Sequence, residues 1–350
     1  MTREENIRGA LLSWYGRHAR DLSFRRTRDP YRIFVAEVAL QQTRVDQGLP
    51  FLEQFFERFP TVEALAAASE DEVLRAWEGL GYYRRARSLR TAAQQIVALH
   101  DGKVPASADE LAKLPGVGPY TAGAVASIAF GARVPAVDGN AARVLSRLFL
   151  IGEDSSTPSG LREFQGRALA LMGRAAPGTF NQALMELGAL VCRPVAPACG
   201  ECPVAPHCKA LAEGAVEDYP RARPRAVLPE VEVAFAVVER RGRVLAVRRG
   251  RGGLLAGLWA LPGGEVRGSE SPEQAISRHL GYCGLKVASS REVDHRRKPF
   301  SSRVWDARVY RCAVKGSTPL LEDARWFTRA DRAKVPFVPF QREILDRLNR

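Results

Sequence analysis

The sequence lacks any long hydrophobic run. No stretch of about 18 consecutive apolar residues occurs along the chain, which argues against a transmembrane helix. The first residues, MTREENIRGALLSWYG, are charged and then amphipathic, without the apolar core or the cleavage site of a secretory signal. We therefore expect a cytoplasmic protein with no targeting signal and no membrane partner.

Acidic residues are outnumbered. The 350 residues contain 39 Asp and Glu against 52 Lys and Arg, giving a net charge of +13 and a pI near 9.9. Such an excess indicates a polyanionic partner, although a GC-rich genome can also enrich arginine. Basic residues gather beside aromatics and glycines in FRRTRDPYR (24–32) and GYYRRARSLR (81–90), as a groove for a nucleic-acid backbone requires. We expect a nucleic acid, ahead of a membrane, as the partner, which would place the protein at the nucleoid.

Two compositional patterns divide the chain. Residues 1–213 are predicted to be nearly all helical. One of these helices has Asp29 as its N-cap and Pro30 as its first residue, and apolar residues recur at helical spacing after them. GAVEDYPRARPRAVLPE (214–230) is typical of a linker. VEVAFAVVERRGRVLAVRRG then predicts a β-hairpin, and RVWDARVYRCAV and ARWFT predict further strands, with helices near 272–280 and 339–349. The fold class is therefore multidomain, with an all-α part followed by an α+β domain.

Four of the six cysteines fall in CRPVAPACGECPVAPHC. Their spacing is C-x6-C-x2-C-x5-C, and four thiolates suit either tetrahedral zinc or a four-iron cluster. The single C-x2-C and the short proline-rich spacers favour iron–sulfur, while His207 keeps zinc as an alternative. Four protein ligands leave no open position, so the site is expected to be structural or redox. The predicted ligands are Cys192, Cys199, Cys202 and Cys208.

LPGVGPYTAG (114–123) joins two predicted helices in a helix-hairpin-helix pattern. Gly116 and Gly118 would let a ligand approach the backbone N–H groups just before a helix N-terminus. That arrangement is suited to a DNA phosphate.

Two carboxylates occupy contrasting environments. Glu37 has Ile33, Phe34 and Leu40 one turn away on a predicted helix, so burial should raise its pKa and suit it as a general acid. Asp138 stands at an N-cap position, where the helix dipole should keep it ionised. A surface glutamate and an ordinary helix cap are the simpler interpretations of each residue alone. Together, one acid and one permanent anion suit cleavage of a glycosidic bond.

These features together resemble the helix-hairpin-helix DNA glycosylases, the endonuclease III superfamily, and most closely its MutY-type adenine glycosylases. The similar segments are EVALQQT, GLGYYRRAR, LPGVGPYTAGAV, AVDGNAARVL and FNQALMELGALVC. The resemblance implies a six-helix domain at 27–130 and a second helical domain, from 1–26 and 131–213, that carries a [4Fe-4S] cluster. The active site would lie between them.

The resemblance also implies roles for particular residues. Glu37 would protonate adenine N7, Asp138 would stabilise the sugar cation, and Tyr120 and Asn140 would support the reaction. Bifunctional relatives carry lysine where Tyr120 stands, so base removal without a lysine-driven lyase step is expected. Contacts to the extruded adenine or to the DNA are expected from Arg25, Leu40, Gln42, Tyr82, Gly116, Gly118 and Gln182, with Gln42 and Tyr82 filling the space that the base vacates.

The segment GLWALPGGEVRGSESPEQAISRHLGYCGL resembles a Nudix motif, including the spacing from Gly264 to Glu270. The metal-binding glutamates are missing, because SRHLGYCGL contains none, so nucleotide hydrolysis is not expected. MutY-type enzymes carry a degenerate domain of this kind, which implies that residues 231–350 recognise 8-oxoguanine. Phe300 and Ser301 would make the contacts, and Ser302 stands where histidine is typical.

The expected substrate is double-stranded DNA with adenine opposite 8-oxoguanine or guanine, and the expected state is a monomer. A thymine/guanine mismatch glycosylase of the same superfamily is a competing interpretation; Glu37 argues against it, because a pyrimidine has no N7 to protonate. A nucleotide-pool hydrolase and a non-catalytic iron–sulfur DNA-binding protein also compete with adenine excision.

Overall fold

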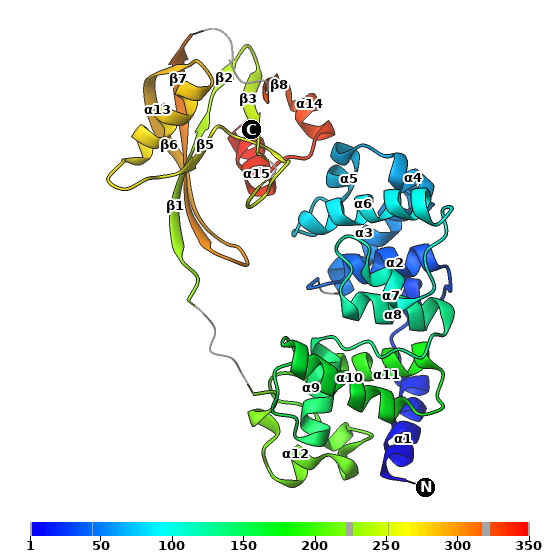
Figure 1. The fold of residues 1–350 in the computed structure, drawn as a ribbon. Coiled ribbons are helices and arrows are strands. Elements are labelled where there is room, and N and C mark those ends of the chain that lie inside the picture. The colour runs from blue at the N-terminus through cyan, green and yellow to red at the C-terminus, as the bar shows by residue number, and fades with distance from the viewer. Residues whose placement is uncertain (1, 44, 222–226, 251, 317–322, 349–350) are drawn as a thin grey trace. The chain divides into compact units, whose positions relative to one another are not determined.

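Helices form the first part of the chain and two small sheets the last part (Figure 1). The structure, a computed structural model, describes residues 2–43, 45–221, 227–250, 252–316 and 323–348. The chain separates into two units: Met1–Ala68 with Ser88–Pro224, and Ser69–Arg87 with Arg225–Arg350. The predicted linker includes residues 222–226, which lie outside the described residues. The division of the helical part into 27–130 and 1–26 with 131–213 stays a prediction.

The helical prediction for the first part of the chain is confirmed. Asp29 caps the helix that carries Glu37: its carboxylate accepts from the backbone N–H groups of Tyr31 and Arg32, and Pro30 begins the helix. The helices are α1 (Arg3–His18), α2 (Pro30–Ala39), α3 (Val45–Arg58), α4 (Val62–Ala67), α5 (Glu70–Ala76), α6 (Arg84–Leu99), α7 (Ala108–Ala112), α8 (Pro119–Phe130), α9 (Gly139–Phe149), α10 (Pro158–Met172), α11 (Pro177–Leu190) and α12 (Lys209–Ala212), with the 3₁₀ turn η1 (Ser23–Arg25) before α2.

One hydrophobic core joins the N-terminal helix to elements more than 100 residues later. Ile7 and Leu11 of α1 are fully buried with Leu145 of α9, Phe164 of α10 and Phe180 of α11. The side chains of Cys192, Cys202 and Cys208 pack against the same cluster. This core fixes α9 and α11, which supply one wall of the site described below.

The predicted helix-hairpin-helix is present as α7 and α8. Gly116 has φ +77°, and a Cβ there would lie 2.6 Å from the Cβ of Ser88, so a side chain is excluded on both grounds. Gly118 is the N-cap of α8, receives no side-chain cap, and has open space around a Cβ position. Gly116 therefore lets the chain approach α6 closely, and no side chain caps the first turn of α8 at Gly118.

The second unit contains two four-stranded sheets. The first sheet has the order β5-β1-β7-β6, and in the second β2, β3 and β4 follow one another while β8 pairs with β3. The strands are β1 (Glu230–Val237), β2 (Glu239–Arg240), β3 (Arg243–Arg248), β4 (Trp259–Ala260), β5 (Gly263–Glu265), β6 (Lys286–Pro299), β7 (Val304–Lys315) and β8 (Ala324–Phe327). Its helices after residue 225 are α13 (Pro272–Tyr282), α14 (Arg329–Lys334) and α15 (Pro339–Leu348).

The predicted hairpin of two long strands is wrong in its pairing. β1 pairs in parallel with β7 and antiparallel with β5, whereas β3 belongs to the other sheet. The hairpin itself joins only β2 and β3 through Arg241 and Gly242, both with positive φ. β1 pairs on both sides because it is a central strand: residues 233–238 are buried without interruption, as in a strand that is covered on both faces.

Candidate active site

A cavity of about 380 Å³ lies within the first unit. Its walls come from segments far apart in the sequence: η1 and the residues before it, α2, the start of α3, α8, the start of α9, and α11. Several predicted site residues meet there, namely Arg25, Glu37, Leu40, Tyr120, Asp138, Asn140 and Gln182. The remaining lining residues are Arg20, Leu22, Phe24, Thr43, Val45, Asp46, Met185, Glu186 and Ala189.

Glu37 projects into this cavity from α2, where its neighbours along the helix are buried. The side chain is only 8% exposed, and burial raises its pKa to about 7. A hydrogen bond from Tyr120 lowers the pKa, Asp138 raises it and Arg25 lowers it, so burial is the dominant effect. Glu37 can therefore hold a proton near neutral pH, as its apolar neighbours predicted.

Tyr120 is the partner of Glu37. It occupies the first turn of α8, directly after Gly118 and Pro119, and its hydroxyl donates to Oε2 of Glu37 at 2.6 Å. Its hydroxyl also lies 3.3 Å from the sulfur of Met185. Burial raises the pKa of Tyr120 well above its usual value, so the phenol remains a donor. The glycine-rich loop thus delivers a neutral hydroxyl to the buried carboxyl group.

Asp138 is the N-cap of α9, as predicted. One carboxylate oxygen accepts from the backbone N–H of Ala141 at 2.7 Å and the other from the side-chain amide of Asn140 at 2.8 Å. Its pKa differs from the expectation: burial raises it, and these hydrogen bonds together with Arg143 only offset part of the effect. The sequence predicted that Asp138 caps the helix, but it did not predict how deeply the cavity buries this carboxylate.

The prediction from sequence missed several cavity residues. Gln182, Met185, Glu186 and Ala189 form a stripe along α11 at the i, i+3, i+4 and i+7 positions, and all of them line the cavity. Only Gln182 was predicted, although the spacing of the stripe could have indicated the rest. Arg20 has no comparable signal, because the segment that carries it has no helical periodicity.

Comparison with known proteins agrees with the geometry. The family model of the HhH-GPD superfamily base excision DNA repair proteins matches residues 35–166, and that of the NUDIX domain matches residues 233–347. A human adenine DNA glycosylase is 36% identical over 387 aligned positions, which cover 93% of this chain and 70% of the human protein. The chain belongs to the adenine DNA glycosylase family.

A bacterial adenine DNA glycosylase and solved glycosylase structures extend this result. The Mycolicibacterium smegmatis adenine DNA glycosylase is 45% identical over 57% of this chain and 67% of its own length. A thermostable thymine-DNA glycosylase covers 60% of this chain and 97% of its own with a TM-score of 0.56 at 27% identity. An endonuclease III–DNA complex covers 61% of this chain and 99% of its own, with a TM-score of 0.53 at 25% identity.

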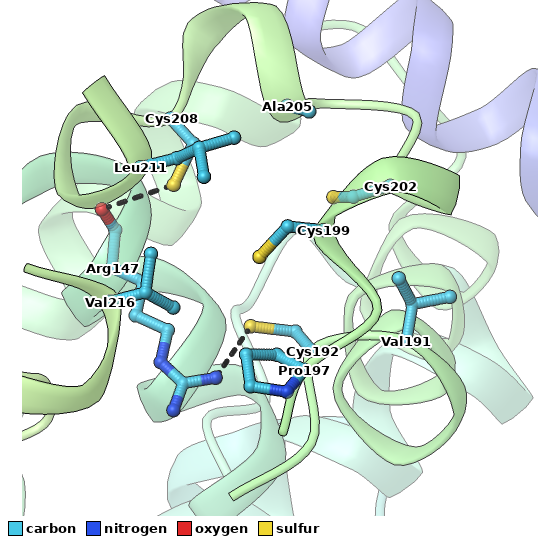
Figure 2. A pocket seen from close by; sticks show the side chains of 10 residues that line it. All are labelled: Arg147, Val191, Cys192, Pro197, Cys199, Cys202, Ala205, Cys208, Leu211 and Val216. Carbon is cyan, nitrogen blue, oxygen red and sulfur yellow. Dashed lines mark hydrogen bonds between the residues drawn. The ribbon is translucent and has the colours of Figure 1, made fainter. Parts of the chain in front are cut away.

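The four clustered cysteines of this family member line one small cavity of about 30 Å³ (Figure 2). The buried guanidinium of Arg147 donates to the sulfur of Cys192 at 3.4 Å, and the thiol of Cys208 donates to the carbonyl of Arg147 at 3.5 Å. The remaining predicted ligands, Cys199 and Cys202, face the same space. The four predicted ligands therefore line the same cavity, but the described residues include no group of three or more such side chains placed to hold a metal ion.

Six of the predicted contact residues lie outside the cavity that contains Glu37, which we call the excision cavity: Gln42, Tyr82, Gly116, Gly118, Phe300 and Ser301. In the second unit, Tyr82, Phe300 and Ser301 line a separate cavity of about 640 Å³. Tyr82 is 46% exposed with φ 45°, and Phe300 packs edge-on against Trp305 with ring centroids 4.9 Å apart. Gln42, in the first unit, is likewise exposed with a positive φ of 54°. Solvent reaches all four of these side chains, although that of Phe300 is half-buried.

The glutamate that ends the predicted Gly264–Glu270 spacing is paired with an arginine. The carboxylate of Glu270 is bound by Arg278 at 2.8 and 2.7 Å, and hydrogen bonding to that arginine lowers its pKa to about 2. His279 lies against Gly264. In the part of the chain that the structure describes, we find no helix long and apolar enough to cross a membrane.

Proposed function

We propose that this protein removes adenine from DNA by hydrolysing its N-glycosidic bond and does not cut the strand itself. The observation that carries the proposal is the pair of Glu37 and Tyr120, joined at 2.6 Å in the cavity that also contains Asp138. A protonated carboxyl group and an anchored carboxylate are the two groups that glycosidic cleavage requires.

In the proposed reaction, adenine is turned out of the duplex into the cavity. Glu37 donates its proton to N7 of the base, so that adenine departs as a neutral leaving group. Asp138 stabilises the positive charge that develops on the sugar, and Asn140 keeps that carboxylate oriented. Water then adds to C1′ of the sugar cation and loses a proton, which restores the acid form of Glu37. Tyr120 cannot form a Schiff base, so the product is an abasic site in an intact strand.

The test is a single-turnover incubation with a labelled duplex carrying adenine opposite 8-oxoguanine, each sample split with and without hot alkali. We expect strand cleavage only after alkali, because an abasic site breaks under alkali but the enzyme has no amine nucleophile at the Tyr120 position. Cleavage without alkali would reveal a lyase nucleophile. Processing of guanine–thymine duplexes in place of adenine would favour a mismatch-thymine glycosylase.

We propose further that the opposite base is recognised by the second unit. Phe300 and Ser301 lie at the turn between β6 and β7, where a backbone hydrogen bond of 2.8 Å from Phe300 to the carbonyl of Arg303 holds the turn. Phe300 offers a ring for stacking and Ser301 an exposed hydroxyl for an 8-oxoguanine edge. The same incubation with plain guanine opposite adenine should therefore proceed more slowly. The protein is proposed to act as a monomer.

The cysteine cavity supports the proposal of a [4Fe-4S] cluster. All four cysteines line one apolar cavity, and Arg147 donates to the sulfur of Cys192, a contact that would help to orient this side chain as a ligand (Figure 2). The single C-x2-C and the short spacers favour this cluster over one zinc ion. When bound, the cluster would hold the cysteine-bearing loop rigidly against the helices. The proposed ligands are Cys192, Cys199, Cys202 and Cys208.

The purified protein should therefore be brown, with broad absorbance near about 400 nm. Cys199→Ser should lose most of this absorbance and bind less iron, measured by metal analysis. Cys283→Ser is the matched control, because Cys283 is buried in the second unit and does not line the cysteine cavity. A colourless wild-type protein with one equivalent of zinc would contradict the cluster.

A further inference from the structure

Glu186 is a carboxylate in the wall of the excision cavity that no step of the proposed reaction uses. Its side chain is 0% exposed, although it lies one helical turn after Gln182 on the cavity side of α11. Burying a charge is unfavourable unless it is paired and hydrogen-bonded. A buried charge at this position therefore needs a physical explanation.

Two arginines surround this carboxylate. Arg20 donates to it from the backbone N–H at 2.9 Å, from Nε at 2.8 Å and from Nη2 at 2.8 Å. Arg25 donates from Nη2 at 2.7 Å. Burial acts to raise the pKa of Glu186, but the hydrogen bonds from Arg20 and Arg25 outweigh it and lower the pKa to about 2. Glu186 is therefore an anion at any pH at which the enzyme works.

Arg25 is the member of this cluster that matters for the chemistry. Its side chain is 14% exposed, its guanidinium lies 5.8 Å from the ring centre of Tyr15, and its positive charge lowers the pKa of Glu37. Arg25 shares the cavity with Glu37 and Asp138, and its charge acts on Glu37. Without its partner Glu186, the guanidinium could turn toward Glu37 within the same cavity.

We propose that Glu186 is a positioning residue for base excision: it holds the guanidinium of Arg25 at the cavity wall and prevents it from pairing with Glu37. The inference rests on the proposed role of Glu37 as the acid. An ion pair with Arg25 would hold Glu37 as a carboxylate, and a carboxylate has no proton to give to the base. By pairing with Arg25, Glu186 thus allows Glu37 to keep the proton that the reaction needs.

The change of the excision rate with pH near neutrality should follow the titration of Glu37, whose pKa is about 7. The charged or titratable groups that face the cavity beside Glu37 come from every element around it. They are Arg20 and Arg25 before α2, Asp46 on α3, Tyr120 on α8, Asp138 before α9 and Glu186 on α11.

The test measures single-turnover excision of adenine as a function of pH. In Glu186→Gln, which keeps the shape but loses the charge, the pH of half-maximal rate should fall from about 7 to about 6 or lower. Glu186→Asp keeps the charge and should restore the wild-type profile. Glu270→Gln is the matched control, since it removes another arginine-bound carboxylate that does not line the cavity, and its profile should stay unchanged.

A second substitution separates positioning from general damage. Adding Arg25→Gln to Glu186→Gln removes the released cation, so the pH of half-maximal rate should return to about 7 or above, even if the rate itself is lower. If thermal unfolding shows that Glu186→Gln does not fold, Arg25→Gln alone should move the profile to higher pH.

The result that would overturn the proposal is a folded Glu186→Gln with the wild-type profile, or an unchanged profile in Arg25→Gln. Either would show that the charge of Arg25 does not reach Glu37. Failure of the proposed function gives a different result, because the wild-type protein would then excise no adenine at any pH.

Discussion

Replacing Asp138 with asparagine should reduce adenine excision by about 10³-fold, because a neutral amide cannot stabilise the cation that forms on the sugar. The fold should survive the change. The side-chain oxygen of asparagine can still accept from the backbone N–H of Ala141, as an N-cap residue does, so α9 keeps its first turn. The measurement is a single-turnover rate with a duplex containing adenine opposite 8-oxoguanine.

Binding to the same duplex separates catalysis from recognition. Asp138→Asn should bind with close to wild-type affinity, measured by gel shift at fixed salt, because DNA binding depends mainly on contacts with phosphates. Asp138→Ala removes the cap as well and should also lower the thermal stability. Wild-type excision by Asp138→Asn would remove this carboxylate from the mechanism.

The pH dependence of excision should identify Glu37 as the acid. The competent form is the protonated one, which predominates below the pKa of about 7. The rate should therefore be highest below that pH and fall by about tenfold for each further pH unit above it. Glu37→Gln should reduce the rate by about 10²–10⁴ and abolish this alkaline decline, because glutamine has no titrating proton.

A conservative change provides the control for this prediction. Glu37→Asp keeps a carboxyl group but withdraws it by one methylene, so a pH-dependent rate should persist at a lower level. Retention of the full alkaline decline in Glu37→Gln would assign the titration to another group of the cavity.

The helical part of the fold follows closely from local signals in the sequence. Asp29 with Pro30 marks the start of α2, and the glycines of 114–123 mark the hairpin before α8, because capping and turn geometry depend on a few adjacent residues. The sheets were harder to predict. β6 was not anticipated, since all of its residues between Lys286 and Pro299 are exposed or half-buried at a sheet edge beside β7, and few of them are apolar.

The candidate active site could likewise be predicted from the sequence only in part. Glu37 and Asp138 were predicted as a pair of carboxylates in contrasting environments, and the role of Tyr120 was implied by the resemblance to the MutY-type glycosylases. The 2.6 Å contact between Glu37 and Tyr120 and the raised pKa of Asp138 depend on how α2, α8 and α9 pack, which no local pattern contains. Arg20 and Glu186 were missed for the same reason. Their pairing joins residues 166 positions apart and is visible only in the folded chain.

The capping of α9 by Asp138 has a consequence for the speed of the proposed reaction. Both of its carboxylate oxygens are already engaged, one by the backbone of Ala141 and one by Asn140. A carboxylate in water must reorient its hydration shell when a positive charge appears beside it. Here that reorganisation free energy is incurred once, when the helix folds, and not again in each catalytic cycle.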